Sequence, residues 1–344
     1  GGDCMAAAGG AENQRKHYRE TSFFGIVQVL KNLGTIRRQM RECQADVAEF
    51  APDVLILVDY PGFNMKMARW AKEHGIRTFY YIAPKVWAWR EWRVKAIRKY
   101  VDRLFIIFPF ERSYFPRHGI EPIFEGNPLV DAIEAKRAAL PSPDEFRRRN
   151  GLDGRPIVAL LAGSRRGEIR DNLPLMAALS RKFPERQFVV AGVAWLDRAL
   201  YEQYTAGSDI RYVCDQTYET LAAAEAAVVT SGTATLETAL LGIPEVVVYR
   251  TVWWQVWLRP YVLKVPWVSL VNLNLGREAV AEIIQSDFSV DRAERELRAI
   301  LRGGSKRGKM LADFGELKTI IGGPGASERF AARMVAELHA QKIK

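Results

Sequence analysis

Short runs of β-branched and aromatic residues alternate along most of the chain with stretches whose apolar positions recur at helical spacing. Nearly continuous apolar strands that are separated by helices are typical of parallel sheets covered on both faces. The pattern therefore predicts an α/β fold of two Rossmann-like domains, with parallel sheets that face a cleft. Strands are expected at residues 54–58, 78–82, 104–108, 157–161, 188–191, 227–229 and 246–249.

A break in this alternation locates the expected domain boundary. Residues 141–154 contain Pro-Ser-Pro, an Arg-rich helical stretch and Gly-Leu-Asp-Gly-Arg-Pro, which together are typical of a linker. The length of 344 residues also exceeds one typical hydrophobic core. We therefore expect an N-terminal domain at 1–150, a second domain at 151–322, and a segment at 323–344 whose amphipathic helix crosses back to the first domain.

Charge and composition narrow the class of partner. The formal net charge of +10 favours anionic partners, such as phosphorylated small molecules or an acidic membrane surface. The basic residues are dispersed and no nucleic-acid-binding module is recognisable, so nucleic acid is not expected. Three widely spaced cysteines, four scattered histidines and the lack of any Asp-x-Asp sequence indicate no metal site, and no cofactor is expected. No apolar run reaches 18 residues, so no transmembrane helix is expected and a cytoplasmic setting is the default.

The clearest candidate for ligand binding lies at 226–248. Apolar residues run into Ser231, Gly232 and Thr233, and a helical stretch that carries Glu237 follows. A loop of small polar residues leading into a helix offers free N–H groups and the positive end of the helix dipole to a phosphate. Glu237, about one turn into the helix, suits the two hydroxyls of a ribose. The segment indicates a nucleotide-diphosphate site, although an ordinary helix cap in a βα unit gives the same pattern.

Two further polar segments follow predicted apolar stretches. Gly163 and Ser164 permit a close approach of the backbone to a ligand, and Arg165 offers a two-pronged contact to a diphosphate. A solvated basic turn is the alternative. A weaker polar cluster, which follows an apolar loop and is expected to close over a ligand, comprises Asn272, Arg277, Glu278 and Gln285.

Asp59 is the candidate catalytic carboxylate. It follows the predicted strand at 54–58 and opens the sequence Asp-Tyr-Pro-Gly-Phe-Asn, which ends at Asn64. In parallel α/β sheets, ligands bind beyond the carboxyl ends of the strands, and a general base that deprotonates a sugar hydroxyl must lie in such a place. The alternative is that Asp59 caps the helix predicted to begin after it.

Aromatic residues gather in segments that also carry Lys and Arg. Trp87, Trp89 and Trp92 fall within 84–93, and four more tryptophans lie between 253 and 267. Near the N-terminus, an apolar stretch precedes a basic one. Tryptophan interleaved with cations is typical of a membrane interface or an acyl-chain groove, whereas core packing is the alternative for each single residue. The expected lipid or acceptor contacts are Asn64, Trp87, Trp89, Trp92, Phe23, Phe24 and Val27.

Taken together, these segments resemble the lipid-A-disaccharide synthase family, which has the two-Rossmann (GT-B) glycosyltransferase fold. The resemblance covers essentially the whole chain, and its tryptophan-rich motif is narrow to the family. The Ser-Gly-Thr…Glu segment is shared by many nucleotide-sugar transferases. The matching segments, in order, are residues 59–64, 84–93, 108–111, 126–131, 163–165, 231–237 and 269–285.

The resemblance implies an inverting transfer of 2,3-diacylglucosamine from its UDP conjugate to the 6-hydroxyl of 2,3-diacylglucosamine 1-phosphate. It implies a β-1,6 linkage, release of UDP, no metal, and a peripheral location at the cytoplasmic face of the bacterial inner membrane, with a tendency to form homodimers. Asp59 matches the family's catalytic aspartate. Arg165, Glu237 and Asn272 match positions associated with the UDP-sugar, and Arg277, Glu278 and Gln285 belong to the same motif.

Family members open with a strand and a Gly-Glu-Ala-Ser-Gly-Asp loop that this sequence lacks, and a truncated record is the interpretation we favour. The sequence therefore leaves open whether a chain without this loop is catalytically active. Two other hypotheses remain. One is a different GT-B enzyme acting on a UDP-sugar, such as an epimerase or a transferase of undecaprenyl-linked substrates. The other is a non-catalytic protein that binds a UDP-sugar or lipid.

Overall fold

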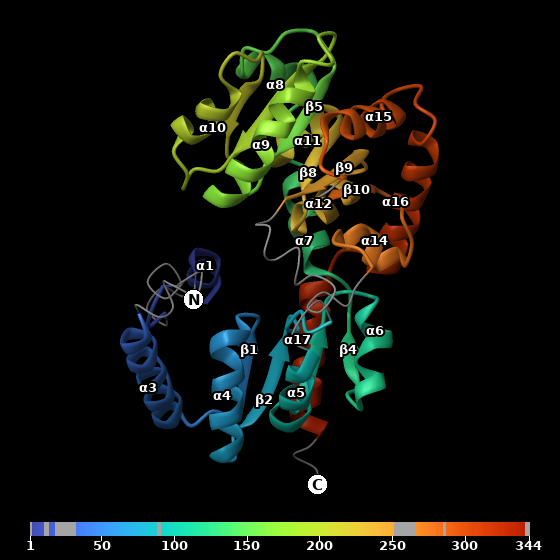
Figure 1. Ribbon diagram of the computed structural model, residues 1–344. Coiled ribbons are helices and arrows are strands. Elements are labelled where there is room, and N and C mark those ends of the chain that lie inside the picture. The colour runs from blue at the N-terminus through green and yellow to red at the C-terminus, as the bar shows by residue number, and fades with distance from the viewer. Residues whose placement is uncertain are drawn as a thin grey trace. The chain divides into compact units, whose positions relative to one another are not determined.

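The computed structural model describes residues 2–9, 14–17, 32–87, 91–250, 266–284 and 287–340. The chain divides into two compact units (Figure 1). Unit 1 comprises Gly1–Pro84 and Lys99–Asp102, and unit 2 comprises Lys85–Arg98 and Arg103–Lys344.

Unit 1 carries two parallel strands and the helices that accompany them. Strands β1 and β2 pair in register from Val54 opposite Arg77 to Val58 opposite Tyr81. Helix α4 buries Met67, Ala68 and Ala71, which recur at the three- to four-residue spacing of one helix face. The elements are α1 (Asp3–Gly9), α3 (Leu33–Phe50), β1 (Val54–Val58), α4 (Pro61–Glu73) and β2 (Arg77–Tyr81).

Unit 2 contains a six-stranded parallel sheet in the order β10-β9-β8-β5-β6-β7. Every residue of β5 is buried, as expected for a central strand of a sheet with both faces covered. The strands are β5 (Ile157–Leu161), β6 (Gln187–Gly192), β7 (Arg211–Cys214), β8 (Ala224–Thr230), β9 (Glu245–Tyr249) and β10 (Ala281–Ile284).

Helices surround this sheet in sequence alternation with its strands (Figure 1). They are α8 (Pro143–Arg149), α9 (Arg166–Ser180), α10 (Arg198–Thr205), α11 (Thr217–Ala223), α12 (Thr233–Leu241), α14 (Leu270–Leu275), α15 (Val290–Ile300) and α16 (Arg307–Ile321). The last described helix is α17 (Ala326–Ala340).

The preceding segment of unit 2 contains a second parallel strand pair, β3 and β4. The elements here are η3 (Glu91–Arg93), α5 (Val94–Tyr100), β3 (Arg103–Ile106), α6 (Glu111–Tyr114), η4 (Pro116–His118), β4 (Pro122–Phe124) and α7 (Pro128–Arg137). The last two residues of α5, Lys99 and Tyr100, belong to unit 1.

The C-terminal helix α17 packs on this strand pair and on α7. The carboxylate of Asp131 on α7 accepts hydrogen bonds from the backbone N–H groups of Gly325 at 2.6 Å and Ser327 at 2.8 Å. The ring of Phe330 meets that of Phe105 on β3 edge to face at 6.2 Å. Burial opposes ionisation of Asp131, but the hydrogen bonds from the start of α17 outweigh it and lower the pKa of this carboxyl.

The predicted fold class is confirmed: the chain folds into parallel-sheet α/β domains. The predicted strands at 54–58 and 157–161 coincide with β1 and β5, and the other five differ from the observed bounds by one to three residues at an end. Three short strands were missed, namely β4, β7 and β10. Among the described residues, no helix is long and apolar enough to cross a membrane.

Candidate functional site

A cavity of about 590 Å³ opens at the carboxyl ends of β5, β6, β8 and β9 in unit 2. This is the edge at which parallel α/β sheets bind their ligands. Its wall combines apolar side chains with the loops that follow the strands. It is lined by Lys85, Trp87, Leu161, Gly163, Ser164, Arg165, Glu168, Ala191, Val193, Thr217, Thr230, Ser231, Gly232, Thr233, Ala234, Glu237, Tyr249, Trp267, Val268, Leu270 and Leu273.

The loop after β5 places Arg165 at the cavity. Gly163 has φ +114°, and a Cβ atom there would lie 2.5 Å from Cβ of Glu168, so only glycine fits. Glu168, in the first turn of α9, accepts a hydrogen bond from the backbone N–H of Ser164 at 2.9 Å. Its other oxygen pairs with Arg165 Nη1 at 2.6 Å. Glu168 therefore holds the loop closed and keeps the exposed guanidinium of Arg165 beside the cavity.

The start of α12 forms another part of the wall. Gly232 is the N-cap and has no side chain that could cap the helix. The N–H of Thr235 donates to the Gly232 carbonyl at 3.4 Å, whereas the N–H groups of Thr233 and Ala234 lie too near the helix start to have an intrahelical partner. Ser231 is fixed on both sides: its N–H donates to the Val248 carbonyl at 3.0 Å and its hydroxyl to the Val268 carbonyl at 2.9 Å. Thr233 is exposed at this end of the helix. The arrangement presents N–H donors and the positive end of a helix dipole to the cavity.

Glu237 lies one turn further along α12 and is held by a tyrosine. The hydroxyl of Tyr218 on α11 donates to Glu237 Oε1 at 2.6 Å. Burial is the main cause that raises the pKa of the Tyr218 hydroxyl, and its hydrogen bond to the carboxylate raises it further. The ammonium of Lys136 lies 4.5 Å from the centre of the Tyr218 ring, within the range of a cation–π contact. The carboxylate of Glu237 is thereby oriented before any ligand arrives.

Trp87 and Lys85 form the part of the wall contributed by the segment before α5. Trp87 is only 6 % exposed, and its indole N–H donates to Glu111 Oε1 at 3.0 Å. The other oxygen of Glu111 accepts from the backbone N–H of Phe108 at 3.2 Å. Complete burial raises the pKa of Glu111 to about 7, although these hydrogen bonds oppose the rise. Glu111 therefore fixes the orientation of a tryptophan that lines the cavity.

The residues of the predicted polar cluster after 269 lie in different environments. Asn272 is fully buried, and all its amide groups are used locally: Nδ2 donates to the Val280 carbonyl at 2.9 Å, and Oδ1 accepts from the N–H of Ala279 at 2.8 Å. It therefore shapes α14, whose Leu270 and Leu273 line the cavity.

Two other members of that cluster lie beside Asn272 in sequence but do not line the cavity. Arg277 pairs with Asp313, at 2.8 Å, and with Glu316, both on α16. Glu278 is exposed. Gln285 lies outside the described residues. The structure thus brings together at the cavity seven of the residues predicted to bind the UDP-sugar: Gly163, Ser164, Arg165, Ser231, Gly232, Thr233 and Glu237.

Asp59 lies in unit 1, directly after β1. Its backbone N–H donates to the Tyr81 carbonyl at 2.9 Å, and its own carbonyl accepts from Asn64 Nδ2 at 2.8 Å and from the Tyr80 hydroxyl. Asp59 and Tyr60 both have φ of 44°. Left-handed backbone at two consecutive non-glycine residues costs of order 1–3 kcal/mol each, and it persists where surrounding contacts enforce it.

The consequence is an exposed carboxylate in a fixed position. The N-cap of α4 is Tyr60, with no side-chain capping bond, so Asp59 does not cap this helix. No described residue forms a hydrogen bond or ion pair with the carboxylate of Asp59. Asn64, which we expected to contact lipid or acceptor, holds the turn by donating from Nδ2 to the carbonyls of Val58 and Asp59.

Among the predicted lipid contacts, Trp92 is 66 % exposed, whereas Trp87 is buried at the cavity. Trp89, Phe23, Phe24 and Val27 lie outside the described residues. The cavity residues that the sequence did not assign to a site include Lys85, Glu168, Thr217 and Trp267. Of these, Glu168 carried a signal, because an acidic residue in the first helical turn after a glycine loop is a common partner for backbone N–H groups.

Comparison with solved structures defines the class. The fold resembles UDP-GlcNAc 2-epimerase from Neisseria meningitidis bound to UDP-GlcNAc, with a TM-score of 0.65 over 91% of this chain and 83% of that one, at 12% identity. It also resembles CalG4, the calicheamicin glycosyltransferase, with a TM-score of 0.56 over 100% of this chain and 90% of that one, at 13% identity. The fold is that of the GT-B glycosyltransferases and the related epimerases.

Sequence comparison then identifies the family. The family model for lipid-A-disaccharide synthetase matches residues 1–320. A lipid-A-disaccharide synthase from Syntrophus aciditrophicus (strain SB) is 38% identical over 315 residues, which are 89% of this chain and 81% of that protein. One from Myxococcus xanthus (strain DK1622) is 38% identical over 330 residues, 93% and 84% of the two chains. The chain belongs to the lipid-A-disaccharide synthetase family, and it is a glycosyltransferase of lipid A biosynthesis.

Proposed function

We propose that the chain transfers 2,3-diacylglucosamine from its UDP conjugate to the 6-hydroxyl of 2,3-diacylglucosamine 1-phosphate, with inversion. The observation that carries the donor half is the cavity in which Arg165, the start of α12 and Glu237 meet. Arg165 and the N–H groups of α12 bind the diphosphate of UDP, and Glu237, held by Tyr218, accepts hydrogen bonds from the ribose hydroxyls.

Asp59 supplies the base in this proposal. Inversion takes a single displacement: the acceptor oxygen forms a bond to the anomeric carbon while the bond from that carbon to the diphosphate oxygen breaks. The proton of the acceptor hydroxyl passes to the carboxylate of Asp59, and UDP leaves with the electron pair of the broken bond. The negative charge that develops on UDP is balanced by Arg165 and by the N–H groups at the start of α12. The carboxylate of Asp59, exposed on an enforced turn and paired with none of the residues that the structure describes, supports this role.

We also propose that different domains bind the donor and the acceptor. Apart from Lys85 and Trp87, every residue that lines the donor cavity falls between 161 and 273, which supports a donor domain at 151–322. Asp59 and the residues that hold its backbone fall between 58 and 81, which supports an acceptor domain at 1–150. The C-terminal segment at 323–344 belongs with the helix that packs on β3 and α7.

We further propose that the acceptor side works against an anionic membrane surface, as a peripheral protein at the cytoplasmic face of the inner membrane. The net charge of +10 and the exposed Trp92 among cationic neighbours support this. A homodimer is compatible with the same reaction.

The Asp59→Asn variant tests the assignment of the base. We expect UDP affinity to stay within about twofold of the parent and turnover to fall by about 10²–10⁴, the usual contribution of a general base. The matched control is Asp53→Asn, which changes an exposed aspartate immediately before the same strand. Near-normal turnover by Asp59→Asn would sink the assignment, whereas loss of UDP binding in that variant would point to a structural defect.

A further inference from the structure

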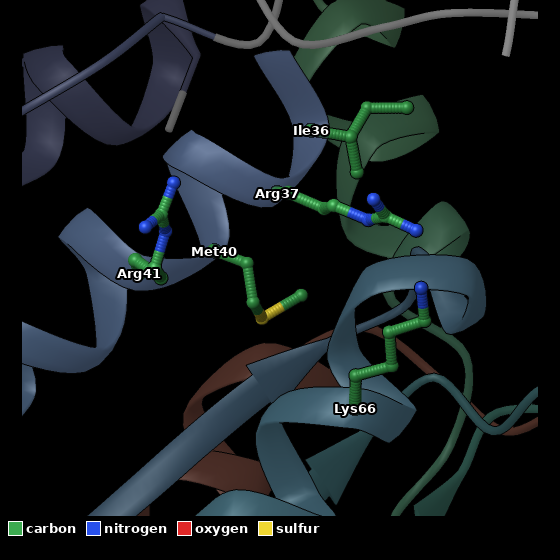
Figure 2. Close-up of a pocket in the computed structure, with 5 residues that line it drawn as sticks. All are labelled: Ile36, Arg37, Met40, Arg41 and Lys66. Atoms are coloured by element: carbon green, nitrogen blue, oxygen red, sulfur yellow. The ribbon is translucent and has the colours of Figure 1, made fainter. Parts of the chain in front are cut away.

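Unit 1 contains a second cavity, of about 520 Å³, between α3 and α4. It is lined by Ile36, Arg37, Met40 and Arg41 from α3 and by Lys66 from α4 (Figure 2). A volume of this order is typical of a site for a small molecule or a lipid headgroup. The mechanism proposed above makes no use of it.

The lining combines cations with an apolar wall. Residues four apart on a helix are neighbours on one face, so α3 sets Ile36 beside Met40. Figure 2 shows the guanidinium of Arg37 and the ammonium of Lys66 extending into the same gap between the helices, with the thioether of Met40 reaching into it and Arg41 directed away. Ile36 and Met40 are half-buried, and Arg37 and Lys66 are exposed. Charge is thus concentrated on one side of an apolar surface.

Neither Arg37 nor Lys66 forms an ion pair or hydrogen bond with any described residue. Arg69, one turn further along α4, differs because its guanidinium pairs with Glu73 at 2.8 Å. Two cations that face one gap repel each other when, as among the described residues, no counter-charge lies with them, and an anion between them relieves that repulsion. A phosphate fits best, since arginine offers it a planar fork of donors and lysine a compact charge.

The apolar wall adds a second requirement. Methionine is unbranched and adaptable, and together with Ile36 it can cover the hydrocarbon part of an amphiphile. A flat, dispersed basic surface would suit the general attraction of a membrane. A converging pair of cations above an apolar wall is instead suited to one phosphate on one lipid molecule.

We infer that Arg37 and Lys66 bind the phosphate of the lipid acceptor. This rests on the proposed function, in which the acceptor carries its phosphate on carbon 1, across the ring oxygen from the carbon whose side arm bears the 6-hydroxyl. Lys66 lies six residues beyond Tyr60, so the helix carries it about 9 Å from the turn that holds Asp59, at 1.5 Å per residue. A sugar that presents its 6-hydroxyl to Asp59 places its 1-phosphate across the ring oxygen from that hydroxyl, where the long side chain of Lys66 can bind it. Lys66 and Arg37 are positioning residues for that sugar.

Direct binding of the acceptor in detergent micelles tests this inference whether or not the chain turns over. We expect Arg37→Ala and Lys66→Ala each to weaken binding of 2,3-diacylglucosamine 1-phosphate by about ten- to a hundredfold, the usual effect of losing a charged hydrogen bond. Binding of the same lipid without its phosphate should change less than twofold, and so should UDP binding. The control Arg69→Ala removes an equal charge from α4 and should leave acceptor binding unchanged.

The outcomes separate the sources of the phosphate. Unchanged acceptor binding in both variants would overturn the inference. If only binding to phosphatidylglycerol vesicles falls, relative to phosphatidylcholine vesicles, the cavity serves a membrane headgroup and the inference is also wrong. Equal losses for the phosphorylated and dephosphorylated lipids would mean that the two residues support the fold of α3 and α4. Failure of the proposed function would appear separately, as absence of product despite phosphate-dependent acceptor binding.

Discussion

Glu111 gives the sharpest quantitative prediction, because the surroundings of a buried carboxyl determine the free energy needed to ionise it. Its side chain is 1 % exposed and lies between the indole of Trp87 and the backbone of Phe108. Burial raises its pKa from the ordinary value of 4.5 to about 7. At about 1.4 kcal/mol for each pH unit between these values, ionisation of Glu111 in the folded chain costs roughly 3 kcal/mol.

The sign follows from proton binding. Between pH 4.5 and 7 the folded chain holds a proton on Glu111 that the unfolded chain has released. The contribution of this group to stability is therefore complete below about pH 4.5 and is lost as the pH rises through about 7. From pH 5 to pH 8 the free energy of unfolding should fall by about 2.5 kcal/mol on account of Glu111 alone.

Glu111→Gln removes the titration while keeping the size of the side chain. Urea unfolding of the parent and the variant at several values between pH 5 and 8, followed by tryptophan fluorescence, gives the difference in free energy at each pH, in which other titrating groups cancel. We expect the variant to gain about 2.5 kcal/mol relative to the parent across this range. Glu121→Gln, at an exposed glutamate, is the matched control and should show no gain. Parallel curves for the parent and Glu111→Gln would refute the reasoning.

Three further predictions concern single contacts. Gly163→Ala introduces a Cβ atom 2.5 Å from Glu168 at a residue with φ +114°. Calorimetry should therefore show that the affinity for UDP falls at least tenfold. The control Gly154→Ala, whose new Cβ has no atom within 4 Å, should bind UDP normally. Tyr218→Phe frees Glu237 from its 2.6 Å hydrogen bond and should weaken UDP binding about fivefold without lowering the melting temperature by more than a few degrees; unchanged affinity would contradict the orienting role. Asp131→Ala removes the acceptor for the N–H groups that begin α17 and should cost about 1 kcal/mol, with faster hydrogen exchange confined to α17 and its contacts; uniform exchange rates would count against it.

The central strands and the donor loop could be predicted from sequence because their physical causes are local. β5 is apolar throughout because it is buried on both faces, and the Gly163 and Ser231 loops consist of residue types that a tight turn at a strand end needs. The missed strands have weak local signals. β4 has three residues and begins with proline, and β7, at the edge of its sheet, begins with an arginine and has exposed residues at both ends.

Contacts between separate elements of the fold could not be predicted from the sequence. The bond from Tyr218 to Glu237 joins α11 to α12, and Lys85 reaches the cavity from a segment that is far from β5 and β8 in the sequence. The cluster after 269 shows a related limit. Asn272 and Arg277 are polar residues in a polar segment, but the structure uses the first to shape α14 and the second to join that segment to α16.

Product formation tests the central claim most directly. The chain is incubated in detergent micelles with UDP-2,3-diacylglucosamine and 2,3-diacylglucosamine 1-phosphate, and the products are examined by mass spectrometry and by the stereochemistry of the new linkage, with Asp59→Asn in parallel. We expect a β-1,6 disaccharide 1-phosphate and an equal amount of UDP from the parent, and little of either from the variant. A different linkage, an epimerised UDP-sugar, or UDP binding without any disaccharide would contradict it.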